Sequence, residues 1–168
     1  MRYWIAFIGS SPFAVINTIW AACREAGYVP DHAVFMINRE LNEEWIDIVR
    51  HWVPRILEEY GVEDPLLSTH MVEETGFQMI CEEYRAHLFD LKANDEVAVD
   101  ITPGRKYMSA IAMEMGLSMN ADHVYYLHLT DNRYHNIPYP IVPLHRHELI
   151  DMKKEFCKVG TNRAVLDE

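Results

Sequence analysis

Two short segments of the chain combine glycine, hydroxyl side chains and an immediate helix start. Residues 9–12 read Gly-Ser-Ser-Pro, and residues 102–106 read Thr-Pro-Gly-Arg-Lys. Glycine lets the backbone approach an anion closely, and the first N–H groups of a helix carry roughly half a positive charge. Hydroxyl groups donate hydrogen bonds to phosphate oxygens, while Arg105 and Lys106 add full charges. We therefore predict that both segments bind phosphate.

The same residues also have a purely structural explanation. Ser10 or Ser11 suits the N-cap of the helix that follows, and Thr102 suits the start of the later helix. Arg105 and Lys106 would then be solvated. We favour binding because the elements around the two segments are expected to place both at one crevice.

Apolar runs of strand type alternate with segments of helical periodicity along the chain. Strands are predicted at residues 3–8, 32–37, 66–70, 96–101 and 123–129. Between them, apolar residues recur at helical spacing, as Phe13, Ile16 and Trp20 do in the first such segment. This alternation predicts an α/β fold: a Rossmann-like, doubly wound, mostly parallel sheet with helices on both faces.

The last part of the chain is less regular. Residues 136–149 contain three prolines and are predicted to form extended structure at the sheet edge. Tyr134, His135 and Tyr139 follow the fifth strand and either line the ligand pocket or pack on the sheet edge. Since 168 residues fit one domain, residues 1–150 are predicted to form a single ligand-binding domain. A short helix and a charged tail are expected over residues 151–168.

The strand order gives the expected place of the site. In an open parallel sheet, ligands bind beyond the carboxyl ends of the strands, where the strand order reverses. For a Rossmann-like order this point lies between the first and fourth strands, which residues 9–12 and 102–106 follow. The residues predicted to bind the ligand are Gly9, Ser10, Ser11, Pro12, Thr102, Pro103, Gly104, Arg105 and Lys106.

The composition of the chain and the absence of several known motifs exclude some classes of function. The chain has 15 Lys and Arg against 26 Asp and Glu, a net charge of -11, which argues against nonspecific binding to nucleic acid or anionic lipid. The motifs GxGxxG, GxxxxGK[ST] and GxSxG are absent from the sequence. No metal or cofactor is expected, because no HExxH or paired Cys/His spacing occurs. Without a membrane segment or secretory signal, and with three unpaired cysteines, a cytoplasmic protein is predicted.

Residues 100–106, Asp-Ile-Thr-Pro-Gly-Arg-Lys, end an apolar strand and open a methionine-rich helix. In this setting they resemble the ligand loop of CRISPR-associated Rossmann fold (CARF) domains, and residues 8–13 resemble the first loop of that family. The resemblance covers the order of elements from residue 3 to residue 129. One departure is Pro103, where the family commonly has glycine; it removes a backbone donor, for which Arg105 can compensate. This departure leaves ring size and cleavage rate open.

The resemblance implies a ligand, a partner and catalytic residues. CARF domains bind cyclic oligoadenylate, a messenger of type III CRISPR systems, across the two-fold axis of a homodimer. Ser11 and Lys106 match positions where the family places ligand-contacting and catalytic residues. Because the chain holds one domain and a short tail, we expect a stand-alone, metal-independent ring nuclease. It would cleave cyclic tetra-adenylate by attack of a ribose 2′-hydroxyl on the neighbouring phosphorus.

Two other interpretations stay open. The chain could bind cyclic oligoadenylate without cleaving it, as the sensor domain of a CRISPR effector. Alternatively, it could be a small-molecule α/β enzyme that uses a mononucleotide such as AMP or S-adenosylmethionine. This last interpretation predicts a competent monomer with one ligand per chain, whereas the first two predict one ligand per dimer.

Overall fold

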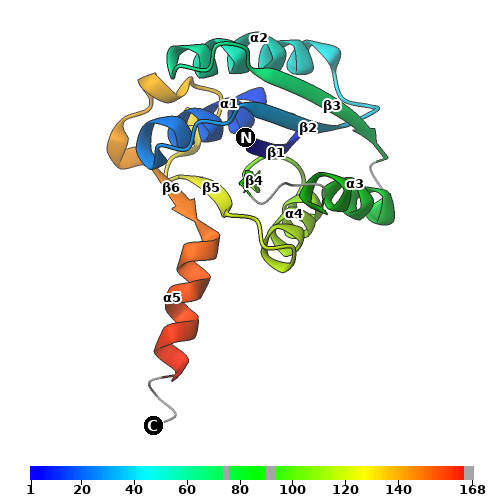
Figure 1. The fold of residues 1–168 in the computed structure, drawn as a ribbon. Coiled ribbons are helices and arrows are strands. Elements are labelled where there is room, and N and C mark those ends of the chain that lie inside the picture. The colour runs from blue at the N-terminus through cyan, green and yellow to red at the C-terminus, as the bar shows by residue number, and fades with distance from the viewer. Residues whose placement is uncertain (74–75, 90–93, 165–168) are drawn as a thin grey trace.

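Six strands form one sheet in the computed structural model, which describes residues 1–73, 76–89 and 94–164 (Figure 1). The strands are β1 (Arg2–Ile8), β2 (His32–Asn38), β3 (Leu66–Val72), β4 (Glu96–Asp100), β5 (His123–Leu129) and β6 (His147–Asp151). Their order is β3-β2-β1-β4-β5-β6, and only the β5–β6 pair is antiparallel among these pairings. The predicted fold is thus confirmed, and all five predicted strands lie within two residues of their expected ends.

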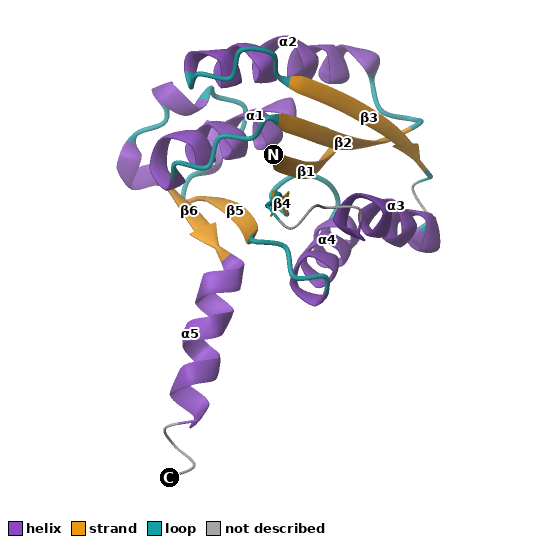
Figure 2. Ribbon diagram, viewed as in Figure 1, coloured by secondary structure: helices purple, strands orange, loops and turns teal. Residues whose placement is uncertain are grey.

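Helices cover both faces of the sheet, as Figure 2 shows. One face carries α1 (Pro12–Ala21) and α2 (Glu43–Glu59), and the other carries α3 (Phe77–Phe89) and α4 (Lys106–Ser118). No helix in the described part of the chain is both long enough and apolar enough to span a membrane.

The side chains of β1 alternate between two cores. Trp4, Ala6 and Ile8 pack with α1 and α2, whereas Ile5 and Phe7 pack with α3 and α4. Each of these five side chains is at most 3% exposed. Burial on both faces explains why this strand is a continuous apolar run rather than an alternating one.

The proline-rich segment differs from its prediction. Residues 132–146, here called the strap, form three short 3-10 turns at Asn132–Tyr134, Tyr139–Ile141 and Leu144–Arg146. The prediction of extended edge structure is therefore wrong for most of residues 136–149 and correct only where β6 begins. Proline lacks the N–H that a strand ladder needs, so pairing with β5 starts after the last proline of the strap.

After β6, the chain continues into α5 (Met152–Ala164), which extends away from the sheet (Figure 1). Lys153 Nζ donates hydrogen bonds to Asn120 Oδ1 at 2.9 Å and to the Ala121 carbonyl at 2.6 Å, which fixes the first turn. The expected helix is present. The end of the predicted tail, residues 165–168, lies outside the described residues, and a domain boundary at residue 150 stays a prediction.

The burial of β2 between β1 and β3 predicts the cost of removing a core ring. Phe35 is fully buried against α1 and α2, so Phe35→Ala is expected to lower the free energy of unfolding by about 3–5 kcal/mol. Phe77→Ala is the matched control because Phe77 is 64% exposed, and its effect should stay below about 0.5 kcal/mol. Urea unfolding measures both values. Equal losses would contradict the burial of β2.

Candidate functional site

The loops that follow β1 and β4 are in direct contact. A Cβ atom added to Gly9 would lie 2.9 Å from the backbone nitrogen of Gly104 and 3.1 Å from its Cα. Gly104 has φ 93°, a left-handed conformation that favours glycine. The contact lies between β1 and β4, where the strand order reverses. The structure thus brings together the two segments that the sequence analysis expected to be neighbours.

One side of this contact opens into a cavity of about 260 Å³, here called the β2-side hollow. Among its lining residues are four of the predicted site residues: Gly9, Ser10, Gly104 and Arg105. The end of β2 contributes Asn38, the loop after it contributes Glu40, and α2 contributes Trp45. These three residues were missed. The available signal was their position after a neighbouring parallel strand, because such strands end at the same edge of the sheet.

The other side opens into a smaller cavity of about 190 Å³, here called the β5-side hollow. Its lining includes Asn17 from α1, Thr102 from the β4 loop, Tyr126 from β5 and His135 from the strap. His135 therefore lines a cavity. Tyr139 instead is buried and packs on Trp20, with ring centroids 6.2 Å apart.

Ser11 connects the first loop to the strap. It holds the N-cap position of α1 but makes no side-chain cap hydrogen bond. Its hydroxyl is buried and donates to Asn136 Oδ1 at 2.9 Å. The capping explanation is therefore wrong for Ser11. A hydroxyl that donates one hydrogen bond retains lone pairs that accept others.

Asn17 holds the strap against α1. Its Nδ2 donates to the Ile137 carbonyl at 2.8 Å, and its Oδ1 accepts from the Tyr139 N–H at 2.9 Å. The side chain is only 2% exposed, so these bonds replace water around the amide. An asparagine on the apolar face of a helix was the sequence signal, because a buried amide needs polar partners.

Asp100, the last residue of β4, anchors the loop that follows this strand. Its Oδ1 accepts from the Thr102 N–H at 2.8 Å, and Thr102 Oγ1 accepts from the Leu127 N–H at 2.8 Å. The β4 loop is thereby tied to both β4 and β5. Burial raises the pKa of the Asp100 carboxyl to about 8, although the hydrogen bond from the Thr102 N–H lowers it. Thr102 is not the N-cap of α4, since Arg105 holds that position.

The basic residues lie at the start of α4. Arg105 and Lys106 are both exposed, and Arg105 lines the β2-side hollow with Glu40. Neither α1 nor α4 has an acidic residue in its first turn, so both helix starts keep their partial positive charge. Pro12 is the first residue of α1, as expected from its missing N–H.

The other residues predicted to bind the ligand lie outside the two hollows. Ser11, Pro12, Pro103 and Lys106 line neither hollow. Pro103 is buried within the loop after β4, whereas Lys106 is exposed. Within the described residues, no group of three or more His, Cys, Asp and Glu side chains is arranged to hold a metal ion.

No protein-family model matches the chain, and no curated protein matches it. Among solved structures, Enterococcus italicus Csm6 bound to cyclic hexa-2'-fluoro-hexa-dAMP has a TM-score of 0.60 and 13% identity, over 99% of this chain and 47% of that one. Protein VC1899 from Vibrio cholerae has a TM-score of 0.54 and 12% identity, over 80% of this chain and 32% of that one. A Type III CRISPR defence DNA nuclease activated by cyclic oligoadenylate has a TM-score of 0.53 and 20% identity, over 90% of this chain and 21% of that one.

These similarities concern the fold. At such identities, they confirm the Rossmann-like α/β architecture that the order of elements predicted. The chain spans less than half the length of each of the three proteins.

The contact between the two loops predicts that Gly9 tolerates no side chain. In Gly9→Ala the new methyl group must push against the Gly104 backbone, so we expect a loss of about 1–3 kcal/mol in the free energy of unfolding. Ser10→Ala, at the exposed neighbouring position, should change it by less than about 0.5 kcal/mol. Urea unfolding measures the loss, and amide hydrogen exchange shows whether both loops loosen. An unchanged stability would show that the loops do not touch.

The buried Asp100 predicts a pH-dependent stability. Its pKa is about 8 in the folded chain against an ordinary value of 3.8, so the folded state retains a proton that the unfolded state releases. Stability is therefore lost as pH rises from about 4 to about 8, with a slope of up to about 1.4 kcal/mol per pH unit. Asp100→Asn cannot ionise and removes this loss.

Urea unfolding across this pH range compares the variant with the unmodified chain. The free energy of unfolding of Asp100→Asn minus that of the unmodified chain should rise with pH. Asp64→Asn is the control because the Asp64 carboxylate is exposed to water, and its difference should stay flat. A flat difference for Asp100→Asn as well would contradict a buried, protonated Asp100.

Proposed function

We propose that the chain is a member of the CARF family and binds cyclic oligoadenylate where the loops after β1 and β4 meet. The observation that carries the proposal is the contact between Gly9 and Gly104, which brings the starts of α1 and α4 to one crevice. Two proteins of the same fold support the choice of ligand. One is bound to a cyclic hexa-dAMP analogue, and the other is activated by cyclic oligoadenylate.

The symmetry of such a ligand favours a homodimer. A cyclic oligonucleotide repeats the same phosphate and base around its ring, so two copies of one chain can present identical loops to its two halves. Two exposed cations at the start of α4, Arg105 and Lys106, would then face phosphates from each chain. Attraction is local, because the net charge of -11 repels polyanions elsewhere on the surface.

We further propose that the chain is a ring nuclease, with cyclic tetra-adenylate as its favoured substrate. The ribose 2′-oxygen attacks the adjacent phosphorus, and the bond from phosphorus to the 5′-oxygen breaks. The proton lost by the 2′-hydroxyl is balanced by the proton that the 5′-oxygen gains. The linear product carries a 2′,3′-cyclic phosphate, and the reaction consumes neither water nor metal. The protein has to hold the backbone in line for attack.

The proposed catalytic residues have distinct roles. Ser11 donates its hydrogen bond to Asn136 Oδ1, so its lone pairs are oriented to accept a hydrogen bond from the 2′-hydroxyl. Lys106 stabilises the charge that develops on the phosphate oxygens, and Arg105 adds a second cation beside it. Asn136 acts as a positioning residue, because it fixes the direction of the Ser11 lone pairs.

A sensor without cleavage is the second candidate. It is favoured by the coverage of the comparisons, since the chain matches only 21% of a nuclease that cyclic oligoadenylate activates. The binding site would be the same, and only the in-line geometry at the phosphate would be missing.

Incubation with cyclic tetra- and hexa-adenylate in EDTA separates the two candidates. We expect linear products with a 2′,3′-cyclic phosphate, resolved by mass spectrometry, and faster loss of the tetra-adenylate. Intact rings at excess protein would exclude the nuclease and leave the sensor. Calorimetry should give one ring per two chains, whereas one AMP or S-adenosylmethionine per chain would favour a mononucleotide enzyme.

Removal of the Lys106 ammonium tests the assignment of the active loop. Lys106→Ala is expected to lower turnover by about 10²- to 10³-fold. It should also weaken binding by about 1.5–3 kcal/mol through the lost charge-assisted phosphate contact. Arg85→Ala is the control, because Arg85 is an exposed cation of α3 that lines neither hollow. Cleavage by Lys106→Ala at the rate of this control would show that the active loop is misplaced.

A further inference from the structure

The β2-side hollow contains a carboxylate that the proposed phosphate contacts do not use. Glu40 and Arg105 are the charged residues of its lining, so the lining has no net charge. A carboxylate repels phosphate but accepts hydrogen bonds from N–H groups. Among the residues that the structure describes, the Glu40 carboxylate has no hydrogen-bond or ion-pair partner. The hollow therefore suits a neutral group that carries an N–H donor.

Local hydrogen bonds fix the short connection from β2 to α2. Asn38 accepts from the Glu40 N–H at 3.1 Å through its Oδ1 and from the Leu41 N–H at 3.0 Å through its carbonyl. Asn42 is the N-cap of α2, and its carbonyl accepts from the Trp45 N–H at 3.0 Å. The backbone positions of Glu40 and Trp45 beside the hollow are thereby fixed.

The other side chains around the hollow are mostly apolar. Ile8, Leu41 and Met108 contribute aliphatic and thioether groups, and the half-buried Trp45 contributes an indole ring. Every nucleobase has a π face that stacks on such a ring. Apolar walls with a few polar groups are the composition of a small-molecule site. The lining of the hollow thus fits a flat, aromatic group.

Adenine has both of these properties. Its ring is flat and aromatic, and its 6-amino group donates hydrogen bonds. Gly9 and Gly104 line the same hollow and belong to the loops proposed to bind phosphate, so a base and its phosphate can be bound side by side. The β5-side hollow is smaller, at about 190 Å³, and no Asp or Glu is part of its lining. The β2-side hollow is therefore the better site for the base.

We propose that the β2-side hollow binds one adenine of the cyclic oligoadenylate. In this arrangement Trp45 stacks on the base, and the Glu40 carboxylate accepts a hydrogen bond from the 6-amino group. The inference rests on the proposed function and deepens it, because it names the residue that recognises the base. Glu40 takes no part in cleavage, so the assignment holds for a nuclease and for a sensor alike.

A double-mutant cycle between protein and ligand tests the role of Glu40. Rings of four 2′-fluoro nucleotides report binding without turnover, because the attacking 2′-hydroxyl is absent. One ring carries adenine, and the other carries purine, which lacks the 6-amino group. In calorimetry the unmodified chain should bind the adenine ring about 10- to 100-fold more tightly. Glu40→Ala has no acceptor for the amino group, so its two affinities should agree within about 2-fold.

Glu44→Ala is the matched control, because Glu44 is an exposed carboxylate of α2 that does not line the hollow. It should keep the full preference for adenine. The same preference in Glu40→Ala as in this control, or no preference in the unmodified chain, would overturn the inference and leave the proposed function standing. If the unmodified chain bound neither ring, the proposed function would fail, and the inference with it.

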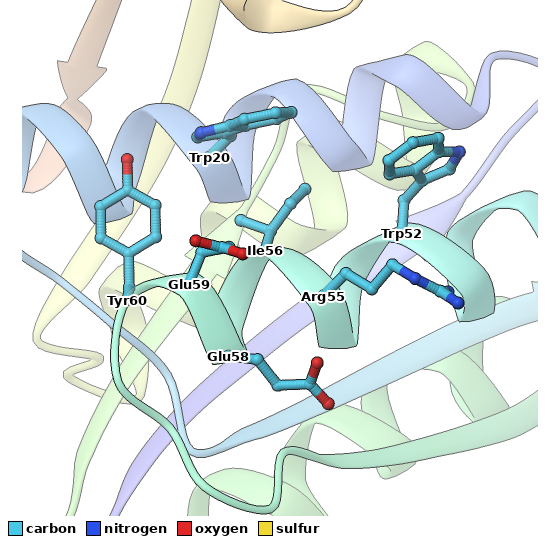
Figure 3. A pocket seen from close by; sticks show the side chains of 7 residues that line it. All are labelled: Trp20, Trp52, Arg55, Ile56, Glu58, Glu59 and Tyr60. Carbon is cyan, nitrogen blue, oxygen red and sulfur yellow. The ribbon is translucent and has the colours of Figure 1, made fainter.

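Tryptophan fluorescence tests the stacking. A base stacked on Trp45 should quench the emission of its indole ring. Trp52→Phe is the control, because Trp52 lies on the same helix but lines a different pocket, with Trp20 and Tyr60 (Figure 3). Titration with the 2′-fluoro adenine ring should quench the unmodified chain and Trp52→Phe, whereas Trp45→Phe should lose most of the quenching. Equal quenching of the two variants would contradict a base on Trp45.

Discussion

The close approach of Gly9 to Gly104 is the constraint on which the candidate site depends. Any side chain on Gly9 would meet the Gly104 backbone, so these two loops can touch only because the residue is glycine. Their contact sets the separation of the α1 and α4 starts, and with it the distance between two regions of partial positive charge. The loops line a hollow toward β2 and a hollow toward β5, with Gly9 and Gly104 in the lining of the first and Thr102 in the lining of the second.

Hydrogen bonds to buried polar groups then fix the parts around the contact. Asp100 and Thr102 tie the loop after β4 to β4 and β5. Ser11 and Asn17 hold the strap on α1. The bonds of Ser11 and Asn17 join residues 125 and 120 positions apart, so they form only when the strap lies against α1. A buried carboxyl and a buried amide cost stability unless they are satisfied. Both polar atoms of Asn17 have partners, whereas burial of the Asp100 carboxyl raises its pKa and makes its ionised form costly in the folded chain.

Positive and negative side chains are distributed unevenly over the surface. The acidic surface disfavours long polyanions, whereas Arg105 and Lys106 present a local positive charge at the start of α4. On the face covered by α1 and α2, carboxylates of α2 share two surface pockets with the exposed ring of Trp52. A chain of net charge -11 can thus keep a locally positive loop, because electrostatic interactions act over about one Debye length in salt.

The sequence predicted five of the six strands, the helices that follow them and the edge of the sheet where the candidate site lies. Apolar runs and helical spacing reflect burial, which is a local property of each element, and glycine and proline mark where the elements end. Tertiary structure decided the rest. Asn38, Glu40 and Trp45 join Gly9 and Arg105 only because β2 lies next to β1 in the sheet. Likewise, nothing near Ser11 in the chain indicates Asn136, since a side-chain pair so distant in sequence is set by how the strap folds back over α1.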